Sequence, residues 1–365
     1  MEEFRAKTRL GVDGEEELIT IAELLDFLNQ GLEVLEAIFS KGSPHRFLNA
    51  RGIPYTYFIN EATAYECIDA AEQIATDTQK PYLRAKAFAQ RPLCLFLEGP
   101  VHYLKLFPEQ ALDIYYAVRS SELYDQKLKM FKVCASLRDQ PYEIGRITAY
   151  ATGWIENESI YTHMQYKWLL ELLRSGQVEA FYEEMRNLLP PFMAPKVYGR
   201  STLENCSFIV SSAFPDPDLH GRAFQPRLSG VTAEMLEMWS LMVAGPKPFR
   251  LDLKGRLQLI LEPLLSSSLF TEKEGLYRYW DREAGWGGIY IPPNCFAFRF
   301  IGQSLVIYHN SGRKSTFGTR GASILGCTFT YRNGMELKEN GPIFSDPQAR
   351  AVRMGDVRRM DVFLG

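Results

Sequence analysis

The residues best suited to chemistry gather in the stretch WIENESIYTHMQYKWLLELLRSG, residues 154–176. The pattern predicts a helix that begins near Ser159, with Glu156 and Asn157 just before it and His163 about one turn in. Free backbone N–H groups and the helix dipole at such a start favour an anion and a neutral histidine that donates one hydrogen bond. We therefore consider His163 a candidate ligand contact. The alternative, a structural histidine on a helix, is the commoner role for this residue type.

A second helix start offers similar chemistry in RLSGVTAEMLEMW, residues 227–239. Gly230 would let a ligand approach the backbone, and Ser229 adds a hydroxyl, so the pair is a candidate anion site. The alternative is that Ser229 or Thr232 simply caps the helix.

Carboxylates in or beside polar segments form a third candidate set. Inverting cleavage of a glycosidic bond uses two carboxyl groups on opposite faces of the sugar, and Glu98 with Glu204 could supply them. Asp216 and Asp218, in PDPDLHG, could equally form a turn or a cation site. Loop carboxylates are more often solvated or act as caps, so composition does not choose among them. The full set is Glu98, Glu156, Glu158, Glu204, Asp216 and Asp218.

Bulk composition narrows the function classes. The 365 residues carry 41 basic and 44 acidic side chains, a net charge of −3, which gives no argument for nucleic acid or a membrane surface. No apolar run approaches the ~18 residues that span a bilayer. The charged start lacks the apolar core of a signal peptide, and the six cysteines are scattered singly, so we expect a cytoplasmic protein. The 19 tyrosines, 23 phenylalanines and five tryptophans are compatible with sugar-stacking walls, although large cores also use them.

The elements that must position these residues change character near Pro248. Apolar spacing predicts helices up to that point, separated by a long polar loop over 196–230. Beyond it, residues alternate with period two around hairpin turns at Lys254-Gly255, near Gly302 and at Asn333-Gly334, which predicts an antiparallel sandwich. We thus expect a mainly α domain over 1–248 followed by a β domain over 249–365. The helices are expected over 22–41, 60–77, 88–107, 108–124, 178–189 and 232–245, besides the one from Ser159.

Several stretches resemble the inverting β-glucan phosphorylases of glycoside hydrolase family 94, which include cellobiose and chitobiose phosphorylases. The segment around His163 resembles that family's run from a Glu-Asn pair to a histidine, and RLSGVTAEML is similar to its Thr-Gly segment. Five further stretches look like the 1,2-β-oligoglucan phosphorylases: YTYFINEATAYE, AFAQRPLCLFLEGPVHYLK, LYDQKLKMFKVCASL, VYGRSTLENCSFIVSSAFPDPDLHGRAF and FRFIGQSLVIYHNSGRKSTFG. The resemblance covers roughly residues 50 to 365, and the order of the stretches, with the length of RSTLENCSFIVSSAFPDPDLHGRAF, makes it fairly specific.

The resemblance implies a partial (α/α)6 barrel followed by a jelly-roll-like antiparallel β-sandwich. It implies reversible, inverting phosphorolysis of β-glucooligosaccharides, of β-1,2 linkage, that gives α-glucose 1-phosphate. Inorganic phosphate would be the co-substrate, with no cofactor and no metal. Carried over, His163, Ser229 and Gly230 would hold phosphate, and Glu156 and Asn157 would contact sugar. Weaker substrate-contact candidates, placed only by the matching stretches, are Gln90, Arg91, Glu98, Lys127, Arg146, Arg200 and Glu204.

The chain departs from the family pattern at the proton donor. The family's general acid lies in an Asp-Trp-Asn-Asp type segment upstream of the matching region, and no such segment occurs here. We therefore identify no catalytic residue, and expect a C-terminal portion that works with a missing N-terminal half or as a homo-oligomer. The alternatives are a non-catalytic carbohydrate-binding or assembly protein, and an inverting glycosidase that uses Glu98 and Glu204.

Overall fold

The computed structural model describes residues 2–9, 11, 16, 18–41, 47–68, 83–201, 203–226, 231–281 and 284–365. They form two compact units, Met1–Gly52 and Ile53–Gly365. The first unit contains α1 (Glu2–Thr8) and α2 (Ile21–Lys41), so the helix predicted over 22–41 is confirmed. A reciprocal cap starts α2: the Thr20 N–H donates to Glu23 Oε2 at 2.8 Å, and the Glu23 N–H donates to Thr20 Oγ1 at 3.2 Å.

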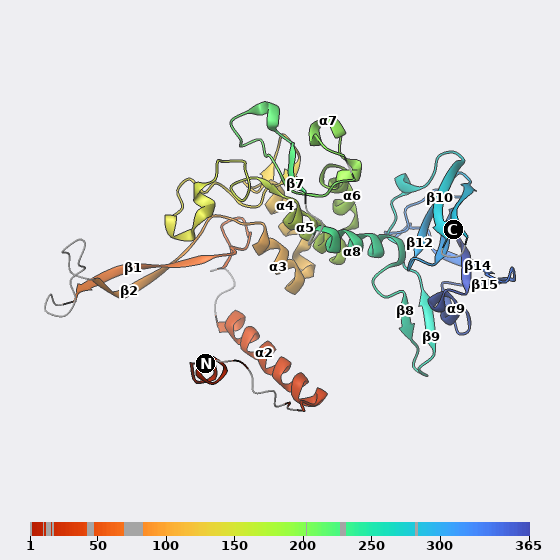
Figure 1. Cartoon of the computed structure of the whole chain (residues 1–365), viewed down its shortest axis with the longest axis horizontal. Coiled ribbons are helices and arrows are strands. Elements are labelled where there is room, and N and C mark those ends of the chain that lie inside the picture. Colours follow the sequence, from red (N-terminus) through yellow and green to blue (C-terminus); the bar gives the residue numbers. More distant parts are fainter. Residues whose placement is uncertain are drawn as a thin grey trace. The chain divides into compact units, whose positions relative to one another are not determined.

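The second unit opens with a two-stranded antiparallel ribbon, β1 (Phe58–Cys67) and β2 (Leu83–Pro92) (Figure 1). Helices follow, and α5 packs against α3, α6 and α8. They are α3 (Glu98–Leu106), α4 (Ala111–Arg119), α5 (Thr162–Arg174), α6 (Val178–Leu188), α7 (Pro195–Tyr198) and α8 (Val231–Ala244). Short 3-10 helices lie at Pro108–Gln110, Tyr142–Ile144, Arg146–Ala149, Pro190–Phe192, Pro217–Leu219 and Ser267–Leu269.

Two small sheets are set among these helices. One is the hairpin of β3 (Tyr124–Asp125) and β4 (Met130–Phe131). The other has three antiparallel strands in the order β5-β6-β7, namely Ile160–Tyr161, Cys206–Ile209 and Ala223–Pro226. Two of its strands, β6 and β7, fall inside the segment 196–230 that the sequence predicted as a loop.

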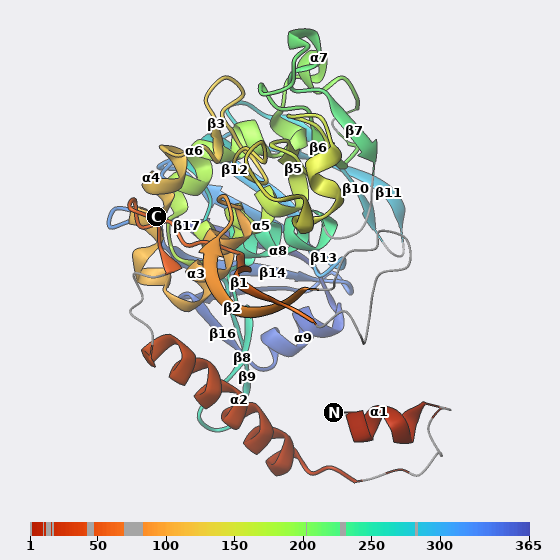
Figure 2. The same cartoon turned by 90° about the vertical axis from the view of Figure 1, so that its left-hand side faces the viewer.

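The remaining strands form three sheets toward the C-terminus (Figure 2). The largest runs β12 (Cys295–Phe300), β13 (Ser304–Asn310), β17 (Val357–Leu364), β14 (Ile324–Tyr331) and β15 (Glu336–Asn340) in spatial order. A second comprises β16 (Ile343–Ser345), β9 (Leu257–Ile260) and β8 (Phe249–Leu251), and β10 (Gly275–Asp281) pairs with β11 (Gly285–Ile291). Helix α9 (Gln348–Met354) leads into β17.

The predicted fold class, mainly α followed by β with a partial (α/α)6 barrel, is wrong. Helix makes up 33% and strand 30% of the structure, and the described residues form no helical barrel. The first errors in the second unit are the helices predicted over 60–77 and from residue 88. Residues 58–67 and 83–92 are instead two paired strands. The predicted antiparallel sandwich is also wrong, since β13 and β17 run parallel in the middle of the five-stranded sheet.

One hydrophobic core joins the helices to the C-terminal strands. Trp168 of α5 is fully buried against Phe131, with ring centroids 5.6 Å apart. Tyr308 of β13, also fully buried, donates its hydroxyl proton to the Val243 carbonyl of α8 at 2.7 Å. The same buried cluster runs on both sides of residue 248. The domain boundary near that residue stays a prediction.

The six cysteines are free thiols with different accessibility. Cys67, the last residue of β1, is exposed and Cys94 is half-buried, whereas the other four are buried. Across the residues that the structure describes, no helix combines the length and apolarity needed to cross a bilayer.

Candidate functional site

The loop before α5 sets the position of His163. The helix begins at Thr162, so His163 is its second residue rather than one turn in, and the predicted start near Ser159 is wrong. Residues 154–159 form turns instead, because Ile155 and Glu158 adopt positive φ angles of 52° and 55° that no helix accommodates. His163 therefore lies in the first turn of α5, among N–H groups that have no partner within the helix.

The predicted Glu-Asn pair is split by this loop. Asn157 is only 7% exposed and donates its side-chain N–H to the Tyr150 carbonyl at 2.7 Å, so it holds the turn together. Glu156 is half-buried, and its carboxylate has no hydrogen bond or ion pair with the described residues. Its neighbour Glu158 is buried in an ion pair with Lys132 at 2.9 Å. Glu156 is thus the member of the pair that can receive a ligand.

His163 meets a carboxylate that the sequence did not single out. Its Nε2 lies 3.1 Å from Oε1 of Glu234, in the first turn of α8. The side chains are 24% and 15% exposed, so the pair is accessible but largely desolvated. Oε2 of Glu234 is buried and finds no hydrogen-bond partner among the described residues. The predicted phosphate contacts Ser229 and Gly230 lie outside the described residues.

A row of aromatic rings extends from His163 across the β5-β6-β7 sheet. The register places Tyr161, Phe208 and Phe224 opposite one another on adjacent strands, so their rings stack. Trp154 continues the row by stacking on Phe224, with centroids 4.0 Å apart and planes 4° apart. At the other end, the Tyr161 ring meets the imidazole of His163 edge-on at 5.8 Å. All these rings except Phe208 are half-buried, which leaves part of the row open to a ligand.

The weaker sequence candidates lie on several separate elements. On the β1-β2 ribbon, Gln90 is exposed and Arg91 pairs with Glu61 at 2.5 Å. The Glu98 carboxylate accepts a hydrogen bond from the Tyr57 hydroxyl at 2.5 Å. Burial, together with that carboxylate, raises the pKa of Tyr57 to about 12.

The remaining weak candidates do not approach His163 through any contact given by the described residues. Arg200 contacts Glu204 at 3.5 Å, and both side chains are largely exposed. Arg146 is exposed in a 3-10 helix, and Lys127 contacts His220 at 2.7 Å. The structure therefore unites His163 with aromatic residues and Glu234, rather than with the predicted cations.

Sequence reasoning missed Glu234 and the aromatic row for a topological reason. Tyr161, Phe208 and Phe224 are separated by up to 63 residues in the chain, and only the three-stranded sheet places them side by side. The one available signal was the rich aromatic content, which is compatible with a sugar-stacking wall but does not say where it lies.

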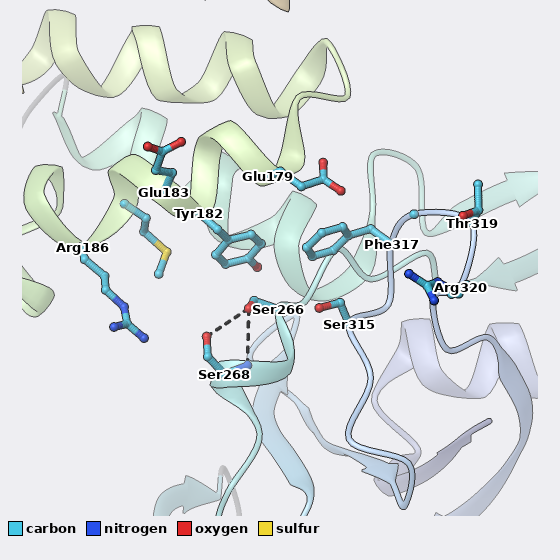
Figure 3. A pocket seen from close by; sticks show the side chains of 12 residues that line it. Glu179, Tyr182, Glu183, Arg186, Ser266, Ser268, Ser315, Phe317, Thr319 and Arg320 are labelled. Carbon is cyan, nitrogen blue, oxygen red and sulfur yellow. Dashed lines mark hydrogen bonds between the residues drawn. The ribbon is translucent and has the colours of Figure 1, made fainter. Parts of the chain in front are cut away.

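Two cavities lie elsewhere in the second unit. A cavity of about 790 Å³ separates α6 from the loops around Ser266 and Phe317 (Figure 3). Tyr182 and Phe317 stack in its wall with planes 8° apart. The other cavity, of about 560 Å³, is lined by Lys127, His220 and largely apolar residues. Within the described ranges, no cluster of three or more histidine, cysteine or acidic side chains is arranged to hold a metal ion.

Comparisons with known proteins leave the chain without an assigned family. No family model matches the sequence, and no curated protein matches it significantly.

Proposed function

We propose that this chain binds β-linked glucooligosaccharides along the aromatic row beside His163 and, with inorganic phosphate, serves glycoside phosphorolysis in the cytoplasm. The observation that carries the proposal is the half-buried His163–Glu234 pair at the end of four stacked aromatic rings. The ordered stretches that resemble β-glucan phosphorylases support the reaction type. The six free thiols support a reducing compartment.

The site suits a sugar because it combines apolar ring edges with hydrogen-bond acceptors. The rings stack on one another, so their exposed edges, rather than their faces, offer contact to the apolar face of a pyranose ring. Oε2 of Glu234 and the Glu156 carboxylate can only accept hydrogen bonds, and sugar hydroxyls can donate them. A ligand hydroxyl would also relieve the cost of a buried oxygen, Oε2 of Glu234, that has no partner among the described residues.

Phosphate would use the other nitrogen of His163. Glu234 lies on Nε2, so Nδ1 is the ring nitrogen left for a ligand. Nδ1 donates to phosphate only in the imidazolium form, and not in the neutral form expected from the sequence. The Glu234 carboxylate opposes a second anion nearby, so phosphate needs further donors. The backbone and hydroxyl groups of Ser229 and Gly230 are our candidates for them.

A second candidate function is carbohydrate binding without phosphorolysis, and Oε2 of Glu234 favours it. This oxygen can accept a hydrogen bond from a sugar hydroxyl, but an ionised phosphate oxygen has no proton to donate to it. The two candidates share the aromatic row and differ in whether phosphate changes saccharide binding.

Calorimetric titration with a β-1,2-linked glucooligosaccharide tests the proposal. We expect Tyr161→Ala and His163→Ala each to weaken binding about tenfold or more, because the first loses apolar contact and the second loses a charge-assisted hydrogen bond of roughly 1.5–3 kcal/mol. Tyr142→Ala is the matched control, since Tyr142 is 85% exposed and lies outside the row. Unchanged affinity in both site variants would refute the assignment.

Product analysis separates the reaction types. Release of α-glucose 1-phosphate only when phosphate is present supports phosphorolysis, whereas release of free sugar without phosphate indicates a glycosidase. Saccharide binding that phosphate leaves unaltered favours the carbohydrate-binding function. The absence of product does not separate the two, because no proton donor is identified in this chain.

A further inference from the structure

We propose that the 560 Å³ cavity beside Lys127 is a second ligand site, which binds a small anion with an apolar body. The proposal does not rest on the function assigned to His163, because none of the residues around His163 lines this cavity. The lining residues come from the β3-β4 hairpin, the C-terminal end of α6, α7 with the segment before it, and the loop that holds His220.

The contacts of His220 leave the charge of Lys127 available to the cavity. Its Nε2 lies 2.7 Å from the carbonyl oxygen of Phe214, which can only accept, so Nε2 carries the proton. Nδ1 lies 2.7 Å from Nζ of Lys127, which as an ammonium can only donate. The imidazole is therefore neutral and bridges a carbonyl to a cation. Lys127 keeps its charge and two further protons for a ligand.

A buried carboxylate fixes the two loops that carry this pair. Asp125 is 3% exposed and accepts hydrogen bonds from the backbone N–H groups of Lys127 and Leu128 at 3.1 and 3.0 Å. It also accepts from the N–H and hydroxyl of Ser212 at 2.7 and 2.8 Å. Four donors converge on this one side chain, so the Lys127 turn and the loop before His220 are held together without a ligand.

A second cation reaches the cavity from α6. Arg186 lines both cavities, and Figure 3 shows its side chain at the edge of the larger one. The guanidinium has no hydrogen bond or ion pair with any residue that the structure describes. No carboxylate is among the lining residues, although Asp216 and Asp218 flank the lining Pro217. Asp216 uses Oδ1 to cap its own turn by accepting from the Asp218 N–H at 3.0 Å.

The apolar part of the lining is incompletely covered. Phe192 and Val197 line the cavity yet remain 45% and 47% exposed, and Met193 and Leu128 stand beside them. Gly221 packs so closely there that a Cβ on it would lie 2.5 Å from Val197 Cγ1. The wall is thus built by close packing, and its open apolar area would gain from contact with an apolar ligand.

These features define the ligand class. A cavity of this volume matches those that hold small molecules, with mostly apolar walls and a few convergent polar groups. Lys127 and Arg186 would bind an oxyanion head, either carboxylate or phosphate, because the fork of an arginine fits both. Phe192 and Val197 would cover an aryl or short alkyl body.

Titration of the full chain with four small probes tests the site: phenylacetate, phenyl phosphate, the neutral phenylethanol and inorganic phosphate. We expect at least one of the two aryl anions to bind at least tenfold more tightly than phenylethanol and inorganic phosphate. The anion that binds more tightly shows whether the site prefers a carboxylate or a phosphate head group. Lys127→Met and Arg186→Met, which keep the aliphatic stem, should each weaken aryl-anion binding about tenfold or more.

Lys129→Met is the matched control, since Lys129 lies on the same turn but does not line the cavity, and circular dichroism verifies that each variant is folded. Three outcomes would overturn the proposal. Phenylethanol could bind as tightly as the anions, inorganic phosphate alone could bind as tightly as phenyl phosphate, or Lys127→Met and Lys129→Met could have equal affinities.

Discussion

Asp361 illustrates how the C-terminal sheet tolerates a charge in its interior. The carboxylate is 9% exposed and accepts hydrogen bonds from Nε2 of His309 at 2.7 Å and from Nη2 of Arg359 at 2.6 Å. Sγ of Cys295 lies 3.3 Å from the other nitrogen of His309. Burial by itself would raise the pKa of Asp361, but the hydrogen bonds from His309 and Arg359 outweigh it and lower the pKa below the usual value.

Replacing Asp361 by asparagine should remove a stabilisation that depends on pH. Because the folded-state pKa is lowered, that stabilisation is fully present above the unfolded carboxyl pKa of about 3.9 and is lost as the pH falls through the folded value. We expect Asp361→Asn to lower the free energy of unfolding by about 1–3 kcal/mol near neutrality and by less in acid.

Urea unfolding at a series of pH values measures this difference. Asp139→Asn, at an exposed position, is the control and should change little at any pH. A wild-type advantage over Asp361→Asn that stays constant from neutral to acid pH would contradict the assignment.

At the scale of elements, the turn at Gly153 connects the loop of Glu156 to the sheet that carries the aromatic row. Gly153 has a φ of 79°, and a Cβ there would lie 2.4 Å from the backbone nitrogen of Phe214. Its N–H donates to the Asn157 carbonyl at 2.8 Å, and its carbonyl accepts from Ser211 N–H at 3.2 Å. Only glycine allows this close approach in this conformation.

Gly153→Ala should therefore destabilise the protein and disturb the saccharide site together. We expect a loss of at least about 1–2 kcal/mol from the left-handed conformation alone, and more from the contact with Phe214. Gly176→Ala is the matched control, because φ is 78° there but a Cβ would meet nothing within 4 Å. Thermal unfolding and saccharide titration should show a larger effect for Gly153→Ala in both measurements, and equal effects would contradict this account.

The accuracy of prediction differs between elements for physical reasons. The turns at Lys254-Gly255, Gly302 and Asn333-Gly334 are local, so the hairpins β8-β9, β12-β13 and β14-β15 are predicted correctly. The helix predicted over 60–77 is wrong where it is described, because residues 60–67 favour helix locally but pair with a strand about 25 residues away. The parallel partner of β13 lies some 50 residues further on, and no local pattern indicates it.

The candidate site divides in the same way. His163 was predicted from residue type and its place near a helix start, which are local properties. The Glu234 contact crosses 71 residues of sequence, and His220 meets Lys127 across 93, so both depend on tertiary packing.

At the scale of the whole second unit, the helices and the C-terminal strands share one buried core. The Tyr308–Val243 hydrogen bond crosses it, and the Tyr182 hydroxyl similarly donates to the Leu264 carbonyl at 2.5 Å. Burial raises the pKa of Tyr308, so its hydroxyl keeps the proton that it donates. We infer that residues on either side of 248 unfold together.

Tyr308→Phe tests this inference. The variant leaves the buried Val243 carbonyl without its donor, and we expect a loss of about 1–3 kcal/mol. All five tryptophans lie in the second unit, on both sides of residue 248, so tryptophan emission reports the unfolding of both sides. If the two sides unfold together, the variant should still show one transition, shifted as a whole. Two separated transitions in calorimetry of the Ile53–Gly365 unit would show that the two sides fold independently.

The distribution of thiols has a practical consequence for spectroscopy. Cys67 is the one exposed cysteine, and it lies on β1, an element that carries neither His163 nor Lys127. A maleimide fluorophore should attach there first, because the other five thiols are half-buried or buried. The native sequence thus supplies its own labelling handle, and the emission of a dye at Cys67 can be followed during ligand titration without an introduced cysteine.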